Sequence, residues 1–295
     1  MGVTENSQAA VFNTLNKYGF RHIEWVRIEP DSMAVPAKAK LKYEVHLTEH
    51  CNLNCKGCYH FSPLAKEEYL DVYEYERDCI QLSMLYNGEA SQILLLGGEP
   101  LLHPDINTII ITTRKYFPKA EILIVTNGIL LAKIDKSFWT CCHDNNIVIA
   151  PTQYPIDIDY ANFEEMAIQN RVEYRYFNEG TGEKELSYSP LDLQGNQNED
   201  DNFFHCYRAG NCVTLSHGRL YTCIMPAHVH HFDEYYKLGL PSFISDGIDI
   251  YSVTTWMDIA EFLSKPISMC KYCDRTRSVS GIEWGQSKKN ISEWI

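Results

Sequence analysis

The sequence predicts an α/β protein whose core is a parallel β-sheet. From residue 41 onward, short apolar runs alternate with amphipathic segments of helix length, and that alternation is typical of βαβ units. Hydrophobic residues make up 45% of the chain and charged residues 22%, which is ordinary for a globular protein. With 295 residues, the chain can bury a full core as one large domain or two smaller ones.

Each predicted strand is a short apolar run, and a segment with a helical pattern follows it. We predict five strands, at Leu41–Leu47, Gln92–Leu96, Glu121–Thr126, Ile147–Ala150 and Val172–Phe177. The helices between them are predicted at Lys66–Tyr86, Ile106–Phe117, Lys136–Asn145 and Asn162–Asn170. We place a sixth strand at Tyr188–Leu193, although Pro190 interrupts it and proline is confined to the margins of strands.

The rest of the chain departs from this alternation. Residues 1–40 are predicted to form an N-terminal extension, and residues 179–202 are rich in Gly, Asn, Asp and Glu, which is typical of a loop or linker. The runs 213–215 and 220–222 flank His217-Gly218. A glycine turn between two apolar runs predicts a β-hairpin.

Charge and hydropathy exclude some classes of partner. The formal net charge is −13, which disfavours binding to nucleic acid or to an anionic membrane surface. The first residues have no basic and apolar signal-peptide pattern, and no apolar run approaches the roughly 20 residues that span a bilayer. We therefore expect a cytoplasmic protein.

The first cysteine cluster follows the first strand directly. Cys51, Cys55 and Cys58 form a C-x3-C-x2-C run, so three thiolates can converge on one metal centre. Three cysteines leave one iron of a [4Fe–4S] cluster without a protein ligand. A zinc site is the alternative, because structural zinc takes four ligands, and His46, His50 or His60 could supply the fourth.

Two further motifs lie at the ends of the next two strands. Gly97-Gly98-Glu99-Pro100 ends the second strand, and Thr126-Asn127-Gly128 ends the third. The carboxyl ends of parallel strands are where such sheets build their sites. With the cysteine run, this ordered set resembles the radical S-adenosylmethionine (SAM) superfamily over about residues 41–177. The resemblance implies a partial (β/α)6 barrel at residues 41–195, a [4Fe–4S] cluster and bound SAM.

The resemblance also implies roles for individual residues. Gly97 and Gly98 would let the backbone approach the methionine part of SAM, and Glu99 would accept a hydrogen bond from its ammonium group. Thr126 and Asn127 would contact its ribose or carboxylate, or simply form a turn. The family usually has an aromatic residue just before the third cysteine, where this chain has Gly57. Tyr59 or Phe61 is the expected replacement beside the adenine.

A second group of cysteines lies in the C-terminal part of the chain. The hairpin ends at Cys223, and a C-x2-C knuckle follows at Cys270 and Cys273. With Cys206, this layout resembles the Twitch domain, the shorter relative of the SPASM domain, which implies an auxiliary [4Fe–4S] cluster within residues 203–280. Residues 281–295 are then a C-terminal tail. Cys212 could replace Cys206 as a ligand, and four thiolates suit structural zinc equally well.

The family resemblance implies an enzyme that cleaves SAM to a 5′-deoxyadenosyl radical and abstracts a hydrogen atom from its substrate. We expect a small hydroxylated substrate, such as a sugar or aminocyclitol, net oxidation, and an electron donor such as flavodoxin or ferredoxin. The alternatives are an epimerase in which Cys212 donates a hydrogen atom, a peptide-modifying maturase, and a non-enzymatic zinc or electron-transfer protein.

Overall fold

One mixed sheet organises the molecule. The computed structural model describes residues 41–177 and 185–295, and over these ranges its largest sheet has the strand order β5-β4-β3-β2-β1-β7-β8-β9. Neighbours from β5 to β7 pair in parallel, whereas β7, β8 and β9 pair antiparallel. The strands span Leu41–Thr48 (β1), Ala90–Gly97 (β2), Glu121–Thr126 (β3), Ile147–Pro151 (β4), Glu173–Tyr174 (β5), Thr214–Ser216 (β7), Arg219–Tyr221 (β8) and Gly247–Asp249 (β9).

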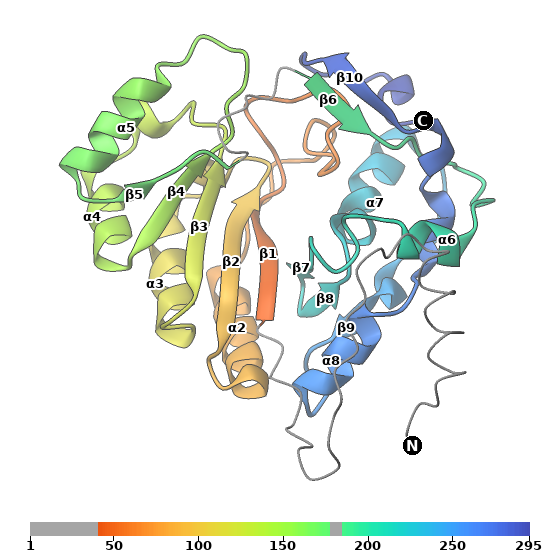
Figure 1. Ribbon diagram of the computed structural model, residues 1–295, viewed down its shortest axis with the longest axis horizontal. Helices are drawn as coiled ribbons and strands as arrows, with labels where there is room; N and C mark the ends of the chain where they lie inside the picture. The colour runs from red at the N-terminus through yellow and green to blue at the C-terminus, as the bar shows by residue number, and fades with distance from the viewer. Residues whose placement is uncertain (1–40, 178–184) are drawn as a thin grey trace, which may run out of the picture.

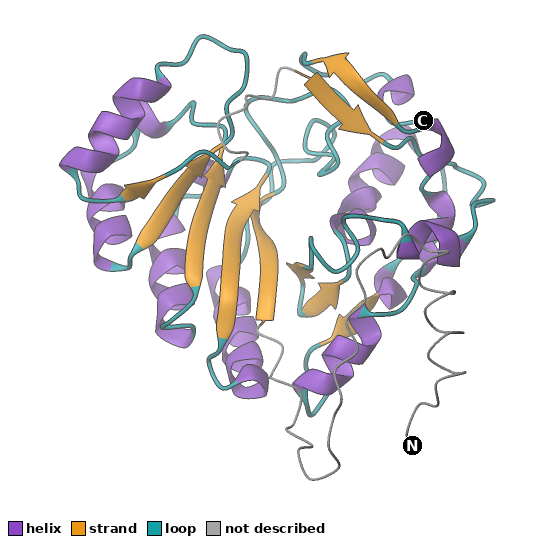
Figure 2. Cartoon of the chain, viewed as in Figure 1, coloured by secondary structure: helices purple, strands orange, loops and turns teal. Residues whose placement is uncertain are grey.

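Four helices cover one face of the parallel strands, as Figures 1 and 2 show. They span Val72–Tyr86 (α2), Ile106–Tyr116 (α3), Lys136–Asp144 (α4) and Tyr160–Gln169 (α5). Alternate residues of β1 (Tyr43, Val45 and Leu47) are buried in the main core with apolar residues of these helices. The predicted α/β class, its five parallel strands and its four helices are therefore confirmed.

Helix α2 begins six residues later than the sequence pattern predicts. The Asp71 side chain accepts hydrogen bonds from the backbone N–H groups of Tyr73 and Glu74, so it caps the helix there. Leu70 instead donates its N–H to the carbonyl of Leu47. The apolar spacing continues upstream of the cap, but the backbone hydrogen bonds do not.

The predicted sixth strand is wrong in position. Strand β6 spans Glu185–Tyr188 and pairs antiparallel with β10 (Val279–Glu283) in a separate small sheet. Pro190 lies beyond this strand, as expected for a residue without an N–H to donate. The sixth parallel position is taken by β7, which lies beside β1. The predicted β7–β8 hairpin is confirmed, and His217 and Gly218 both have positive φ angles at its turn.

The C-terminal half forms a second core. The helices of this half span Glu199–Phe204 (α6), Ile224–Tyr236 (α7) and Trp256–Leu263 (α8), and the buried Ile259 of α8 belongs to the main core. Short 3-10 turns lie at Pro100–Leu102 and Leu131–Lys133 in the N-terminal half, and at Ile244–Asp246, Ser268–Tyr272, Arg275–Arg277 and Ile291–Glu293 in the C-terminal half. Phe61, Phe232 and Trp294 are buried together in this core. It therefore joins the loop after β1, helix α7 and the end of the chain.

The expected N-terminal extension, residues 1–40, lies outside the described residues, as do residues 178–184 of the expected loop. Within the described parts, no helix is long and apolar enough to cross a membrane. The large sheet runs on from β1 to β7, so the expected core and auxiliary regions share it. The domain boundaries themselves stay predictions.

Candidate functional site

The three cysteines of the first cluster line one cavity. Cys51, Cys55 and Cys58 lie in the loop after β1, and the cavity of about 340 Å³ that they line lies at the carboxyl ends of β2 and β3. Its other walls include most of the residues singled out in the sequence, namely Gly97, Gly98, Thr126, Asn127 and Tyr59. Glu99 is not among the lining residues.

Gly97 and Gly98 are glycines for a reason that the sequence did not reveal. A Cβ atom on Gly98 would lie 2.0 Å from the carbonyl oxygen of His50, and one on Gly97 would lie 2.4 Å from that of Thr48. Gly97 also has a φ of +140°, which side chains rarely adopt. The end of β2 therefore packs directly on the backbone that leads into the cysteine loop.

The Glu99 carboxylate faces protein donors. Its side chain is fully buried and accepts hydrogen bonds from the Thr126 hydroxyl (2.6 Å) and from the N–H groups of Asn127 (2.9 Å) and Leu101 (3.1 Å). Burial raises the pKa of Glu99 to about 7, although these hydrogen bonds oppose the shift. The carboxylate thus fastens the end of β2 to the end of β3, and its expected contact with a bound ammonium stays a prediction.

The C-terminal tail packs on the cysteine loop, which sequence reasoning missed. The Trp284 indole N–H donates to the Cys55 sulfur at 3.3 Å, and Lys56 N–H donates to the Gly285 carbonyl at 2.8 Å. A Cβ on Gly57 would lie 3.1 Å from the Glu293 carbonyl, and the φ of Gly57 is +63°. Gly57 therefore departs from the family pattern because the tail occupies the space beside it.

The two aromatic candidates for the adenine site differ in position. Phe61 is fully buried in the second core and contacts the rings of Phe232 and Trp294, so it does not face the cavity. Tyr59 lines the cavity, and the Arg208 guanidinium lies 3.7 Å from the centre of its ring. Tyr59 is the candidate that remains.

A second cavity, of about 310 Å³, brings together the other predicted cysteines. Its lining includes Cys206, Cys223, Cys270 and Cys273, whereas Cys212 lines the first cavity instead. The Asn202 side-chain amide, which the sequence gave no reason to single out, donates to the carbonyls of Cys270 (2.7 Å) and Cys273 (2.6 Å) and so holds the knuckle. Three residues line both cavities: Tyr59, Tyr207 and Arg208.

Four thiols in these cavities have raised pKa values, so they are protonated at neutral pH unless a metal binds them. Burial raises the pKa of Cys51 and of Cys270 to about 11, and that of Cys55 and of Cys273 to about 12. Thiolates are the form that ligates iron or zinc, so binding of either metal releases protons. The predicted ligand sets fit the cysteine ligation of iron–sulfur clusters; they are Cys51, Cys55 and Cys58 in one cavity, and Cys206, Cys223, Cys270 and Cys273 in the other.

The histidines considered as a fourth zinc ligand take different positions. His60 lines the first cavity with the three cysteines. His46 is hydrogen-bonded to His60 and Glu49, and the His50 ring accepts a hydrogen bond from the Glu68 N–H. Of the three, His60 is the one that shares the cavity with the thiols.

One family of known proteins matches the N-terminal part of the chain. Residues 45–139 match the Radical SAM superfamily. The chain is 30% identical over 98 residues to a GTP 3′,8-cyclase of Nautilia profundicola, which is 33% of this chain and 31% of that relative. It is 35% identical over 91 residues to molybdenum cofactor biosynthesis protein 1 of Bos taurus, which is 30% of this chain and 14% of that relative. The matches thus span about a third or less of these curated relatives.

Solved structures with a similar arrangement include BtrN in complex with AdoMet and 2-DOIA. That structure has a TM-score of 0.48 and 17% identity, and the match covers 81% of this chain and 94% of BtrN. A second is anSMEcpe with bound AdoMet and the Cp18Cys peptide, with a TM-score of 0.37, 19% identity, and coverage of 46% of this chain and 42% of that one. Residues 45–139, which include the Cys51–Cys58 loop and Asn127, are thus the part of the chain that matches the radical SAM superfamily.

Proposed function

We propose that this protein cleaves SAM reductively and oxidises a small hydroxylated substrate, such as a sugar or an aminocyclitol. Membership of the superfamily implies one [4Fe–4S] cluster and SAM. The observation that carries the rest of the proposal is the pair of cysteine-lined cavities with three lining residues in common, Tyr59, Tyr207 and Arg208. Their adjacency suits an electron transfer between a substrate in one and a cluster in the other.

Cys51, Cys55 and Cys58 would hold the radical cluster, and the three-cysteine set leaves one iron open for SAM. Gly97, Gly98, Thr126 and Asn127 would contact SAM, with Tyr59 beside its adenine. When bound, the cluster and SAM supply a 5′-deoxyadenosyl radical that takes a hydrogen atom from a substrate C–H bond. The Asn127 amide lies 3.7 Å from the Cys51 sulfur, so this residue would orient the ligand loop as well as SAM.

Four cysteines, Cys206, Cys223, Cys270 and Cys273, would hold the auxiliary cluster. Because all four ligand positions are filled by thiols, the cluster would have no open iron for substrate, and electron transfer is its natural role. Oxidation of an alcohol then balances as follows: a hydrogen atom leaves the carbon, a proton leaves the hydroxyl, one electron passes to the auxiliary cluster, and a carbonyl forms.

Polar side chains of the first cavity support the substrate class. Glu44, His60, Tyr154 and Arg208 are among the lining residues of this cavity, and such side chains supply hydrogen bonds to hydroxyl groups. The GTP 3′,8-cyclases take their name from a different substrate, but the likeness extends over only 98 residues. Flavodoxin or ferredoxin is the electron donor that we propose.

One observation favours a second candidate, a radical epimerase. Cys212 lines the first cavity with the radical-cluster cysteines, and burial raises the pKa of its thiol to about 11. At neutral pH the thiol therefore keeps the hydrogen that it could return to a substrate radical. Oxidation remains the first proposal because the four-cysteine cavity lies next to the site, and a cluster in that cavity would serve as the electron acceptor.

Turnover in deuterium oxide separates the two reactions. The substrate is first identified by mass spectrometry of ligands that co-purify anaerobically with the protein. For an oxidation, we expect a product two hydrogens lighter than the substrate, no solvent deuterium on carbon, and an active Cys212→Ala variant. Cys141→Ala is the matched control, because it changes a thiol on α4 in the main core.

The opposite pattern would establish the epimerase. Deuterium at a product carbon, lost in Cys212→Ala but kept in Cys141→Ala, would refute the oxidation and assign the thiol as the hydrogen donor.

A further inference from the structure

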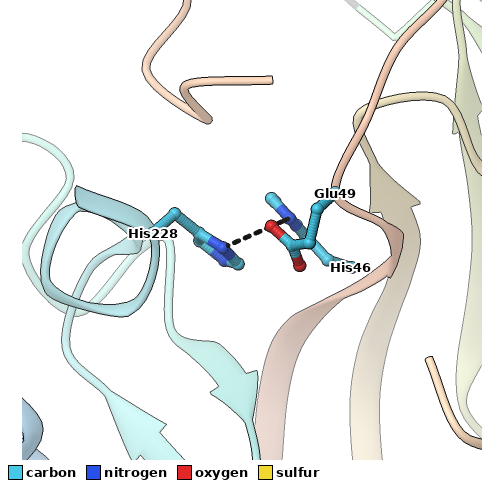
Figure 3. A group of neighbouring side chains, drawn as sticks. All are labelled: His46, Glu49 and His228. Carbon is cyan, nitrogen blue, oxygen red and sulfur yellow. Dashed lines mark hydrogen bonds and ion pairs between the residues drawn. The ribbon is translucent and has the colours of Figure 1, made fainter. Parts of the chain in front are cut away.

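A group of histidines and one glutamate lies where β1 faces α7, outside both cysteine sets. Figure 3 shows His46 and Glu49 at the end of β1 and His228 opposite them on α7. His231 is on the same face of α7, because residues three positions apart are neighbours on a helix. We call His46, Glu49, His228 and His231 the histidine–glutamate cluster.

Three ring nitrogens of this cluster converge on a single oxygen. The Oε2 atom of Glu49 lies 3.1 Å from His46 Nδ1, 2.9 Å from His228 Nδ1 and 2.7 Å from His231 Nε2. Donor atoms of His46, Glu49 and His228 all lie within 4.8 Å of one another. A tetrahedral zinc ion with bonds of about 2.0–2.1 Å places its ligand atoms about 3.3 Å apart. The three nitrogen distances to the Glu49 oxygen are close to that value.

Hydrogen bonds alone do not account for the arrangement. His46, His228 and His231 are all 5% exposed or less, and the Nε2 atom of His228 is buried without a hydrogen-bond partner among the described residues. Leaving a buried polar atom unpaired is costly. Three imidazoles surround one carboxylate, and one ring nitrogen has no hydrogen-bond partner. The cluster therefore offers more nitrogen ligands than its hydrogen bonds use.

The surroundings of the cluster suit a cation. His46 Nε2 lies 2.7 Å from His60 Nδ1, so a neighbouring side chain fixes the orientation of the His46 ring. A cavity of about 230 Å³ borders His46 and Glu49, and its walls carry Glu68, Asp71 and Glu74. Acidic walls attract cations, so this cavity supplies an access route for the ion.

We propose that His46, Glu49 and His228, with His231 as the fourth ligand, form a mononuclear site for a divalent transition metal, with zinc as the ion that fits best. Three imidazoles and a carboxylate are donors that zinc accepts in four-coordinate sites. The ion would tie the end of β1, two residues before Cys51, to the helix that follows Cys223. It would therefore fix the two cysteine sets relative to each other, and the site does not depend on the reaction proposed above.

The test uses the anaerobic holoenzyme, freed of any affinity tag, with its clusters in place. It is dialysed against a chelator and then against micromolar zinc, and zinc and sulfide are measured on the same sample. We expect one zinc per chain. X-ray absorption at the zinc edge should show nitrogen and oxygen ligands with the outer-shell scattering of imidazole. Because iron does not contribute at this edge, the clusters do not obscure the signal.

Variants locate the ion. His228→Ala and Glu49→Gln should each weaken zinc binding by more than the roughly 10- to 100-fold that loss of an outer-shell partner costs. His143→Ala is the matched control, because this exposed histidine lies on α4 and contacts Asp144 instead of Glu49. Sulfide content reports whether each variant still holds its clusters.

Three results would overturn the proposal: no zinc retained by the wild type, sulfur ligands at the zinc edge, or equal retention by the wild type and His228→Ala. The first two rest on the wild type alone, so they remain decisive if a variant fails to fold.

Discussion

At the residue scale, one buried carboxylate connects two of the motifs. Glu99 takes three hydrogen bonds from β3 and its own turn, so Thr126 and Asn127 are held in place from behind the cavity. The Gly97-Gly98-Glu99-Pro100 motif could be recognised in the sequence because it follows a predicted strand. Its internal contacts could not, because nothing in Gly-Gly-Glu-Pro says whether the carboxylate faces a ligand or another turn.

Glu99→Gln tests this supporting role. A glutamine nitrogen would face the Asn127 N–H, and one buried donor left unpaired costs about 1–3 kcal/mol of stability. The pKa of Glu99 rises from 4.5 to about 7 on folding, so the folded state binds more protons and stability falls as pH rises through that window. The variant should lack this slope, as measured by thermal unfolding between about pH 4.5 and about pH 7.

Two readouts distinguish the alternatives for Glu99. Unchanged stability with SAM affinity weakened by about 1.5–3 kcal/mol would show that the carboxylate binds the ammonium directly and supports nothing else.

At the element scale, periodicity predicted the parallel strands and their helices because each buries one continuous apolar face. It misplaced the sixth strand, since β6 pairs with β10, about 90 residues later in the chain. The contact of the C-terminal tail with the cysteine loop was not predicted for the same reason. The only sign of this contact in the sequence was Gly57, a glycine where the family has an aromatic residue. A side chain there would meet the carbonyl of Glu293, which is remote in the sequence.

The tail should tune the radical cluster through Trp284. Hydrogen bonds to the ligand sulfurs help to set the reduction potential of a cluster, and they favour the reduced, more negative state. Trp284→Phe keeps an aromatic ring but removes the donor to Cys55. We expect the potential to fall by roughly 20–60 mV, the equivalent of a hydrogen bond of about 0.5–1.5 kcal/mol, in a redox titration followed by electron paramagnetic resonance.

Trp256→Phe, at the start of α8, is the matched control and should leave the potential unchanged. An equal potential in Trp284→Phe and the wild type would mean that this indole does not act on the cluster.

At the scale of the whole molecule, eight cysteines from distant parts of the chain line two adjacent cavities, and seven of them are the predicted cluster ligands. The sequence predicted both sets from spacing and family resemblance, and it left Cys206 and Cys212 as rivals. Only the fold separates them, because Cys212 precedes β7, which lies beside β1, and so it faces the first cavity. The histidine–glutamate cluster has no sequence signature, since its two halves, one in the β1 region and one on α7, are about 180 residues apart.

The central claim is that the Cys51, Cys55 and Cys58 site generates the radical, and formation of 5′-deoxyadenosine by the reduced, anaerobic protein tests it most directly. The wild type should hold about eight iron and eight sulfide per chain and cleave SAM slowly without substrate. Replacing the three cysteines together by Ala should abolish cleavage and leave about four iron bound. Unchanged cleavage in this triple variant, or a wild type that holds zinc in place of iron and releases no 5′-deoxyadenosine, would contradict the account.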